Sequence, residues 1–469
     1  MSDVLKATTE VNIQDVSVFG LGKLGASMVA GMASRGLNVI GVDINGESVR
    51  LVNEGQAPVQ ETGLGEMIAA NRPRIRATMD PVAAVTGSDI SFVIVPTPSD
   101  DRGAFTLQYI RFALRDIGKA LKEKVGYHVV VITSTVLPGS TRHGLIPVLE
   151  EYSGKKCGVD FGVCYSPEFI ALGTVIRDFL NPDFYLIGQF DQRSGDFLEA
   201  VNKRVSQNGA PSKRMSIENA EIAKIALNSY VTMKISFANT LADICERVEG
   251  GDVDVVSDAI GQDKRVGRKY LTGGLGFGGP CFPRDNLALS FIGRSLGANM
   301  DLLEVNDRYN RSLSERLVQR LTDSIPAGST VAVLGLAYKP LSHVIEESPG
   351  VFMAKALSDA GMRVIGYDPL ASTGAKSALQ YDALVTDNLK EALKDADVVL
   401  VATPDEIFRN LSAEEIRGSK EKVTLIDCWR VLKDKLESAS GIEYVPIGKA
   451  IDGESSAEVF IDLWSSEAA

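Results

Sequence analysis

The stretch that decides the fold covers residues 15–43, DVSVFGLGKLGASMVAGMASRGLNVIGVD. An apolar strand over 16–19 leads into a glycine-rich turn and a helix, and a second strand over 38–42 ends at Asp43. A strand, a glycine turn, a helix, a strand and an acid in this order form the dinucleotide-binding βαβ unit. The pattern therefore predicts a Rossmann-like domain at the N-terminal end of the chain.

The three glycines of the turn have separate tasks. Gly20 permits the tight turn, Gly22 lets a pyrophosphate approach the backbone, and Gly25 lets the helix pack on the strand. The unpaired N–H groups at the helix N-terminus would hold the phosphates. Asp43 can accept both hydroxyls of a ribose and would repel a 2′-phosphate, so the pattern favours NAD over NADP.

Length and composition exclude several classes of protein. The 469 residues predict two or three domains, and 45% hydrophobic with 23% charged residues is typical of a globular protein. The net charge of -12, with no basic patch, opposes nucleic-acid binding. The five cysteines are dispersed without a C-x-x-C pair, so neither a disulfide framework nor a metal site is expected.

The N-terminus is polar and no apolar run is long enough to span a bilayer. The sequence therefore predicts neither a signal peptide nor a membrane partner, and the cytoplasm is the default location.

Further apolar runs follow the first βαβ unit. Near-continuous runs of this kind are typical of parallel strands covered on both faces, and they occur at 90–98, 128–136, 160–167 and 183–188. Thr97 and Thr135 follow two of these strands, at the carboxyl edge of the predicted sheet, where ligands bind.

The C-terminal part repeats the scheme. STVAVLGLAYKP (329–340), GMRVIGYDP (361–369) and DADVVLVATP (395–404) match the first strands of the N-terminal part in order. This copy keeps an acid, Asp368, but lacks the three-glycine pattern. It either binds a different nucleotide or is structural.

A long helical region joins the two parts. Residues 216–251 contain no proline and carry an apolar stripe, so they predict a long helix that could serve as a spine and a dimerisation surface. The expected fold is α/β, with two Rossmann-like parallel-sheet domains joined by a long central helix and helical region. The expected domains are 1–210, 211–325 and 326–469.

Two short patterns could carry chemistry. The loop GGLGFGGPCFPRD (273–285) presents Cys281 among glycines that free backbone N–H groups for an anion. Lys224 and Asn228 lie four residues apart on one face of the predicted helix. Taken alone, the cysteine could be a small core residue and the Lys/Asn pair a solvated polar face.

Together these motifs resemble the UDP-glucose/GDP-mannose dehydrogenase family over nearly the whole chain. The resemblance rests on the glycine turn and on ordered motifs further along: VPTP (95–98), STV (134–136), SPEF (166–169), DFLNPD (178–183), Lys224-x-x-x-Asn228, GFGGPCFPRD (276–285) and GLAYKP (335–340).

The resemblance implies a four-electron, NAD-dependent oxidation of the C6 alcohol of a nucleotide sugar to a carboxylate. It implies Cys281 as the covalent nucleophile, Lys224 as the group that stabilises the oxyanion or shuttles protons, and Asn228 as its partner at the sugar. Asp285, Thr135 and Glu168 match the residues that hold the hydrolytic water and take its proton.

The resemblance also implies binding residues. Those for NAD are Gly20, Gly22, Leu24, Gly25, Asp43, Thr97, Thr135 and Arg284. Those for the substrate are Phe169, Lys224, Asn228, Arg265, Tyr270, Leu271, Gly278, Tyr338 and Lys339. Arg265 matches an arginine that reaches into the neighbouring subunit, so a homodimer or a higher homo-oligomer is expected.

Several positions depart from the family pattern. Pro280 stands where a serine is usual, Leu172 where a glutamate is, and Glu346 where an arginine is. Trp429 replaces a substrate-binding arginine, and Ser48 a basic residue. These departures spare the residues that the resemblance assigns to the chemistry. They leave open which nucleotide sugar is the substrate.

The leading hypothesis is a UDP-glucose 6-dehydrogenase-like enzyme, with GDP-mannose or a UDP-N-acetylhexosamine as alternative substrates. A single-step β-hydroxyacid dehydrogenase shares the Rossmann domain and the Lys-x-x-x-Asn pair but has no use for Cys281. A non-catalytic nucleotide-sugar sensor is the third alternative. The number of NADH molecules formed per substrate molecule separates the three alternatives. It is two for the 6-dehydrogenase, one for the single-step dehydrogenase and none for the sensor.

Overall fold

The computed structural model describes residues 12–100, 102–170, 173–450 and 459–461. The chain folds into two compact units, residues 1–226 and 227–469. In the described ranges no helix is long and apolar enough to cross a membrane.

The first unit is built on an eight-stranded sheet in the order β3-β2-β1-β4-β5-β6-β7-β8. Its strands are β1 (Asp15–Phe19), β2 (Asn38–Val42), β3 (Ile75–Thr78), β4 (Ile90–Val93), β5 (Val129–Ile132), β6 (Gly162–Tyr165), β7 (Tyr185–Gln189) and β8 (Ser212–Ser216). The first six strands are parallel neighbours, as in a doubly wound sheet. The expected Rossmann-like domain is confirmed.

One expectation about this sheet is wrong. The run at 183–188 was expected as another parallel strand, but β7 pairs antiparallel with β6. A parallel pair needs a long crossover that returns the chain to the opposite edge of the sheet. The described residues of this connection form one short helix, α7 (Val175–Leu180). It packs on α1, since a Cβ on Gly31 would lie 2.8 Å from the ring of Phe179.

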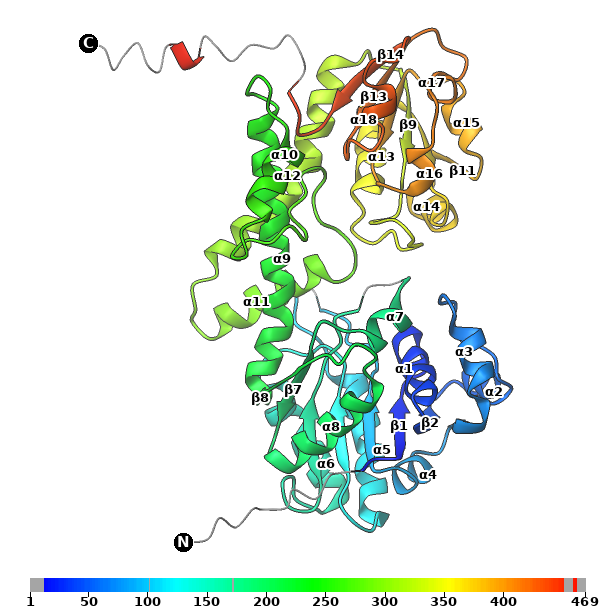
Figure 1. Cartoon of the computed structure of the whole chain (residues 1–469), viewed down its shortest axis with the longest axis vertical. Coiled ribbons are helices and arrows are strands. Elements are labelled where there is room, and N and C mark those ends of the chain that lie inside the picture. Colours follow the sequence, from blue (N-terminus) through cyan, green and yellow to red (C-terminus); the bar gives the residue numbers. More distant parts are fainter. Residues whose placement is uncertain (1–11, 101, 171–172, 451–458, 462–469) are drawn as a thin grey trace, which may run out of the picture. The chain divides into compact units, whose positions relative to one another are not determined.

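Helices cover both faces of this sheet (Figure 1). Side chains alternate between the two faces along each strand, so an apolar cluster forms on each face and the helices bury it. The helices of the unit are α1 (Lys23–Ser34), α2 (Gly46–Asn53), α3 (Leu64–Ala70), a 3₁₀ turn (Arg72–Arg74), α4 (Pro81–Thr86), α5 (Gln108–Glu123), a π turn (Ser140–Leu145), α6 (Ile146–Ser153), α7, α8 (Gln192–Val205) and the start of α9 (Ile217–Cys245). The long helix expected over 216–251 is confirmed as one continuous helix, but it ends at Cys245.

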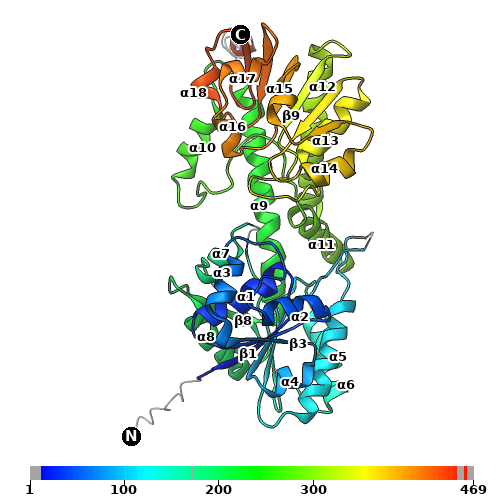
Figure 2. The same cartoon turned by 90° about the vertical axis from the view of Figure 1, so that its right-hand side faces the viewer.

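The second unit contains a six-stranded parallel sheet in the order β11-β10-β9-β12-β13-β14. Figure 2 labels one of its strands, β9. Its strands are β9 (Thr330–Leu334), β10 (Arg363–Tyr367), β11 (Leu384–Thr386), β12 (Val398–Val401), β13 (Val423–Asp427) and β14 (Ile442–Pro446). This order repeats that of the first six strands of unit one, so the C-terminal part is a second Rossmann-like sheet.

Helices precede and cover the second sheet. They are the rest of α9, α10 (Val253–Gly261), α11 (Phe282–Ser295), α12 (Asp301–Ser324), α13 (Pro349–Asp359), α14 (Ser372–Leu379), α15 (Leu389–Leu393), α16 (Glu406–Arg409), α17 (Ala413–Arg417) and α18 (Lys433–Leu436). Two apolar clusters fill the two faces of the sheet.

The turn after β1 requires glycine at two of its three glycine positions, Gly20 and Gly25. Gly20 has a φ of +104°, and a Cβ there would lie 2.2 Å from the Ile94 carbonyl oxygen. A Cβ on Gly25 would lie 1.8 Å from the carbonyl oxygen of Gly20, so α1 can approach the turn only with glycine at that position. A Cβ on Gly22 would meet nothing within 4 Å, so this position is open to a ligand.

We expect the substitutions Gly25→Ala and Gly22→Ala to separate folding from cofactor binding. Gly25→Ala forces a methyl group into backbone and should lower the free energy of unfolding by about 1–3 kcal/mol or more. Gly22→Ala should leave stability within about 1 kcal/mol of the wild type but weaken NAD binding, because the methyl group occupies pyrophosphate space. Thermal unfolding and calorimetric titration with NAD measure the two effects. Equal stability of Gly25→Ala and the wild type would contradict this account of the turn.

Candidate active site and cofactor cleft

A cleft of about 900 Å³ opens at the carboxyl edge of the first sheet, between the ends of β1 and β4. This is the point where the strand order reverses, which is where ligands bind in such sheets. The cleft is lined by the glycine turn with Leu24, by Asp43 and by the aromatic residues Tyr109 and Phe112 of α5. Its size, its mostly apolar lining and the open Gly22 fit a dinucleotide.

The two matching acids, Asp43 and Asp368, are engaged differently. The Asp43 carboxylate accepts N–H groups from Leu21 at 2.6 Å and Asn45 at 2.8 Å. The Asp368 carboxylate accepts four N–H groups, two on each oxygen, and is 5% exposed. Asp368 is therefore saturated by its own backbone, whereas Asp43 keeps capacity for a ribose.

Glu168, Phe169 and Lys224 form a cluster in the first unit. The Lys224 side chain is almost buried, and its Nζ donates to the Glu168 carbonyl oxygen at 2.7 Å. The same Nζ lies 4.5 Å from the centre of the Phe169 ring. Burial raises the pKa of the Glu168 carboxyl to about 7, and the positive charge of Lys224 opposes part of that rise. A carboxyl with such a pKa can act as a general base near neutral pH.

The loop after β5 carries Thr135 and is anchored to α9. Glu221 is fully buried and accepts the N–H groups of Gly139 at 2.6 Å and Thr141 at 2.8 Å. Burial raises the pKa of Glu221, and these hydrogen bonds oppose the rise. Because Glu221 lies one turn before Lys224, the helix that carries the lysine also fixes the loop that carries Thr135.

Cys281 lies at the N-terminus of α11 and is exposed, while Cys157, Cys164, Cys245 and Cys428 are buried; all five lie in the described ranges. The positive end of the helix dipole stabilises negative charge on a sulfur placed there. The interpretation of Cys281 as a small core residue is thus excluded.

Asp285, in the first turn of α11, accepts a hydrogen bond from Asn228 Nδ2 at 2.7 Å. Arg284 donates to the other carboxylate oxygen at 3.1 Å, and Asp285 is 1% exposed. Asn228, Asp285 and the start of the Cys281 helix are therefore one connected group in the second unit.

Two asparagines hold the backbone of the glycine loop before Cys281. Asn239 of α9 accepts the Gly274 N–H at 2.8 Å and donates to the Leu275 carbonyl at 3.3 Å. Asn310 of α12 accepts from the Phe277 N–H at 2.8 Å and donates to its carbonyl at 2.9 Å. The loop has no secondary structure, so these side chains replace the backbone partners that a strand would have.

The loop packs closely on the segment after β9. A Cβ on Gly278 would lie 2.0 Å from the Glu347 carbonyl oxygen, and one on Gly279 would lie 2.4 Å from the Tyr338 ring. Burial raises the pKa of Tyr338 to about 12, and the neighbouring Cys281 adds to the rise.

Two buried hydroxyls lie at the carboxyl edge of the second sheet. Thr403 Oγ1, just after β12, and Ser348 Oγ, at the start of α13, have no hydrogen-bond partner among the described residues. Oxygens of a ligand bound at this edge would satisfy them.

Some expected residues take other contacts. Arg265 is exposed and pairs with Asp263 at 2.6 Å, while Lys339 lies 5.7 Å from the centre of the Tyr338 ring. Leu271 is buried. Tyr270, 45% exposed and in the left-handed region at φ +66°, contacts the ring of Phe282.

The departures from the family pattern also have definite places. Glu346 is exposed, and its carbonyl oxygen accepts the Gly279 N–H at 3.1 Å. Trp429 Nε1 donates to the Ala402 carbonyl at 2.9 Å. Pro280 is partly buried just before Cys281, and Leu172 lies outside the described residues.

Sequence reasoning missed four residues of this region: Glu221, Asn239, Asn310 and Arg430. Each binds backbone groups far away in the chain. A polar residue on an otherwise apolar helix face was the only available signal for the asparagines.

Three family models match the chain in order. The NAD binding domain of the UDP-glucose/GDP-mannose dehydrogenase family matches residues 14–206, its central domain 218–312 and its UDP binding domain 332–434.

Individual relatives match over nearly the full length. The UDP-glucose 6-dehydrogenase of Haloferax volcanii is 36% identical over 434 residues, 92% of this chain and 99% of that protein. The GDP-mannose 6-dehydrogenase of Pseudomonas putida is 35% identical over 427 residues, 88% of this chain and 95% of that protein. The structure of a UDP-glucose dehydrogenase from Pyrobaculum islandicum superposes with a TM-score of 0.83 at 33% identity, covering 94% and 98% of the two chains.

The glycine turn and its cleft, the two Rossmann-like sheets and these matches lead to one conclusion. The chain belongs to the UDP-glucose/GDP-mannose dehydrogenase family and is an NAD-dependent nucleotide-sugar dehydrogenase.

Proposed function

We propose that this enzyme oxidises the C6 alcohol of a UDP-sugar, most simply UDP-glucose, to the carboxylate in two oxidation steps, the second of them on a covalent adduct with Cys281. The observation that carries the proposal is the single exposed cysteine, Cys281, at the N-terminus of α11. The match to a UDP binding domain and the relative from Haloferax volcanii support the nucleotide. NAD, when bound, supplies the hydride acceptor for both oxidations.

Cys281 captures the product of the first oxidation. That oxidation converts the C6 alcohol to an aldehyde, and the thiolate then forms a bond to C6 while the carbonyl electron pair moves to oxygen. The ammonium group of Lys224 is assigned to stabilise this oxyanion, and Asn228 to hydrogen-bond the sugar. Covalent capture keeps the reactive aldehyde from leaving the enzyme.

The second oxidation leaves a thioester on Cys281, and water cleaves it. Glu168, with its raised pKa, is assigned as the base that takes the proton of this water. Asp285 and Thr135 are assigned to orient the water. The carbon–sulfur bond breaks with its electron pair on sulfur, which restores the thiolate and releases the acid.

The remaining assignments follow the same proposal. NAD is held by the glycine turn with Leu24 and Asp43, and by Thr97, Thr135 and Arg284. The sugar nucleotide is held by Phe169, Arg265, Tyr270, Leu271, Gly278, Tyr338 and Lys339. The domains are 1–210, 211–325 and 326–469. Because catalysis needs a free thiol, the expected compartment is a reducing one, the cytoplasm.

GDP-mannose is the second candidate substrate. The relative from Pseudomonas putida that bears this name is 35% identical, one percentage point below the UDP-glucose relative. Parallel assays with UDP-glucose, UDP-N-acetylhexosamines and GDP-mannose decide between them.

We expect the wild type to form two NADH per substrate molecule consumed. Cys281→Ser should lower the rate of acid formation by about three orders of magnitude or more, because serine is a far weaker nucleophile at neutral pH. NADH absorbance and chromatography of the sugar nucleotide measure both quantities. One NADH per substrate, or normal acid formation by Cys281→Ser, would refute covalent catalysis. No turnover of any substrate in the panel would favour a sensor.

The pH profile of kcat should show an acidic limb with a midpoint near 7. Glu168 must be ionised to accept a proton, so the rate should fall as pH drops through its raised pKa of about 7. Glu168→Gln should lose about 100-fold or more in kcat and remove this limb. Glu218→Gln, which changes a carboxylate of α9 that pairs with Arg142, is the control and should keep the limb. An unchanged limb in Glu168→Gln would assign the titration elsewhere.

We further propose a homodimer formed through α9, the state in which Arg265 would reach the neighbouring subunit. Tyr230, Phe237 and Ile244 recur every seven residues on this helix and are 55%, 54% and 53% exposed. Large apolar side chains exposed in a row mark a protein interface, and a second copy would present the same row.

Phe237→Arg should shift the protein from dimer to monomer, because it would bury an unpaired charge in the interface. Light scattering after size-exclusion chromatography measures the mass. Tyr381→Arg, at a side chain that is 99% exposed and off the helix, is the control and should leave the dimer intact. A dimeric Phe237→Arg protein, or a monomeric wild type, would contradict the proposed interface.

A further inference from the structure

The loop after β13, residues 428–432, lies at the carboxyl edge of the second sheet, where nucleotides bind in this fold. Asp427 fixes this loop from within. Its fully buried carboxylate accepts the Trp429 N–H at 3.2 Å and the Leu432 N–H at 2.8 Å, and it also accepts the Tyr444 hydroxyl at 3.0 Å. These bonds hold the loop at the edge, where Trp429 also donates to the carbonyl of Ala402, the residue before the unpartnered Thr403.

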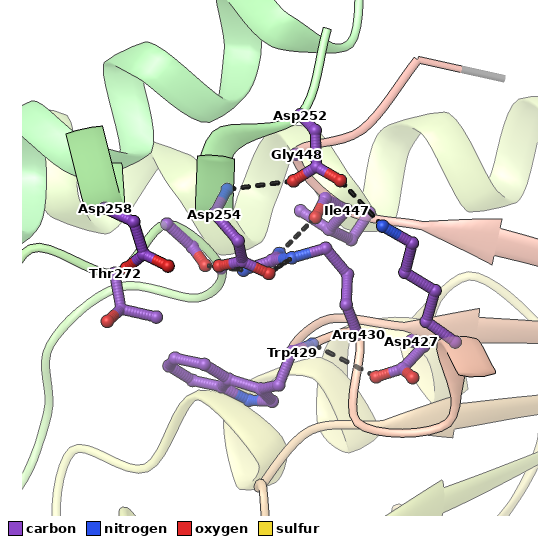
Figure 3. Close-up of polar contacts among 12 residues, drawn as sticks. Asp252, Asp254, Asp258, Thr272, Asp427, Trp429, Arg430, Ile447 and Gly448 are labelled. Atoms are coloured by element: carbon purple, nitrogen blue, oxygen red, sulfur yellow. Dashed lines mark hydrogen bonds and ion pairs between the residues drawn. The ribbon is translucent and has the colours of Figure 1, made fainter. Parts of the chain in front are cut away.

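Two consecutive residues of this loop, Trp429 and Arg430 (Figure 3), contact two consecutive residues of the glycine loop. Arg430 Nη2 donates to the Gly273 carbonyl oxygen at 2.8 Å. A Cβ on Gly274 would lie 3.0 Å from Cε3 of the Trp429 ring. The start of the segment that carries Cys281 is thus attached to the edge that would hold a nucleotide.

Further contacts hold the Arg430 side chain in this position. Its side chain is 1% exposed and forms two hydrogen bonds with Asp254 of α10, at 2.7 and 2.9 Å, and one with the Ile447 carbonyl. Its backbone has a φ of +57°, a strained conformation for a residue other than glycine. Such strain persists only where several contacts enforce it, and it is common at functional sites.

We propose that Arg430 is a positioning residue that transmits nucleotide binding at the edge of the second sheet to the loop of Cys281. A nucleotide that packs against residues 428–432 favours one position of Trp429 and Arg430, and through Gly273 and Gly274 one position of the glycine loop. The inference rests on the proposed function, in which the nucleotide binds this sheet and Cys281 reacts.

Lys433 offers a matched control. It is the first residue of α18, and it pairs at 2.7 Å with Asp252, the N-cap residue of the same helix, α10. The contacts described for Lys433 involve no atom of the glycine loop. A general loosening of this region would affect variants of Lys433 and Arg430 alike, whereas transmission through Gly273 needs Arg430.

The readout is the alkylation rate of Cys281 by iodoacetamide, in which the thiolate forms a bond to carbon and iodide leaves. The other four cysteines are buried, so mass spectrometry can follow this one site. We expect saturating UDP, with GDP as the second probe, to change the rate in the wild type by about fivefold or more. Arg430→Met should abolish the change and Lys433→Met should retain it.

The outcomes separate the inference from the proposed function on which it rests. A nucleotide effect retained in Arg430→Met, absent in the wild type despite binding, or lost equally in Lys433→Met overturns the transmission role. If Arg430→Met unfolds, Asp254→Asn removes one anchor of the guanidinium and should reduce the effect. Calorimetry decides the nucleotide itself: if neither UDP nor GDP binds the wild type, the proposed function fails and the inference with it.

Discussion

The close approach of a helix to the turn that precedes it sets the geometry of both Rossmann-like sheets. In the first unit Gly25 lies against the Gly20 carbonyl, and in the second Gly350 lies against the Gly335 carbonyl, where a Cβ would be 2.1 Å away. The N–H groups of Gly20 and Gly335 donate to equivalent strands, at 2.8 Å in each case. This contact fixes the first helix of each sheet beside its carboxyl edge.

What differs between the two halves is the length of chain between the turn and the helix. The α1 helix starts three residues after Gly20, whereas α13 starts at Pro349, fourteen residues after Gly335. The inserted segment carries Tyr338 and packs on the glycine loop. The same packing contact therefore lies beside the dinucleotide cleft in the first unit. In the second unit it lies beside the inserted segment that packs on the cysteine loop.

The βαβ unit, the long helix and the cysteine loop could be predicted from sequence because each has a strong local pattern. The strands β3 and β8 were missed because IRAT and SKRMS are short and largely polar. The antiparallel β7 depended on a connection whose packing has no local signature. In the second repeat the packing glycine, Gly350, was missed because the insertion moved it out of register.

The residues of the candidate site could be predicted only where a local pattern or a family motif marks them. Four residues of the region bind backbone groups of segments far away in the sequence: Glu221, Asn239, Asn310 and Arg430. Contacts of this kind produce no recognisable spacing pattern in the sequence. For the same reason the sequence alone could not show that backbone N–H groups occupy all the acceptor positions of the Asp368 carboxylate, whereas the Asp43 carboxylate keeps some available.

The distribution of thiols has a consequence for oxidative damage. Four cysteines are enclosed by packed side chains, and one is held in the open on an irregular loop. Peroxide attacks accessible thiolates, so the sulfenic acid would form at Cys281 while the apolar interior stays chemically unchanged. If Cys281 is the nucleophile, as proposed, its oxidation would inactivate the enzyme with the fold intact, and a reductant would restore activity.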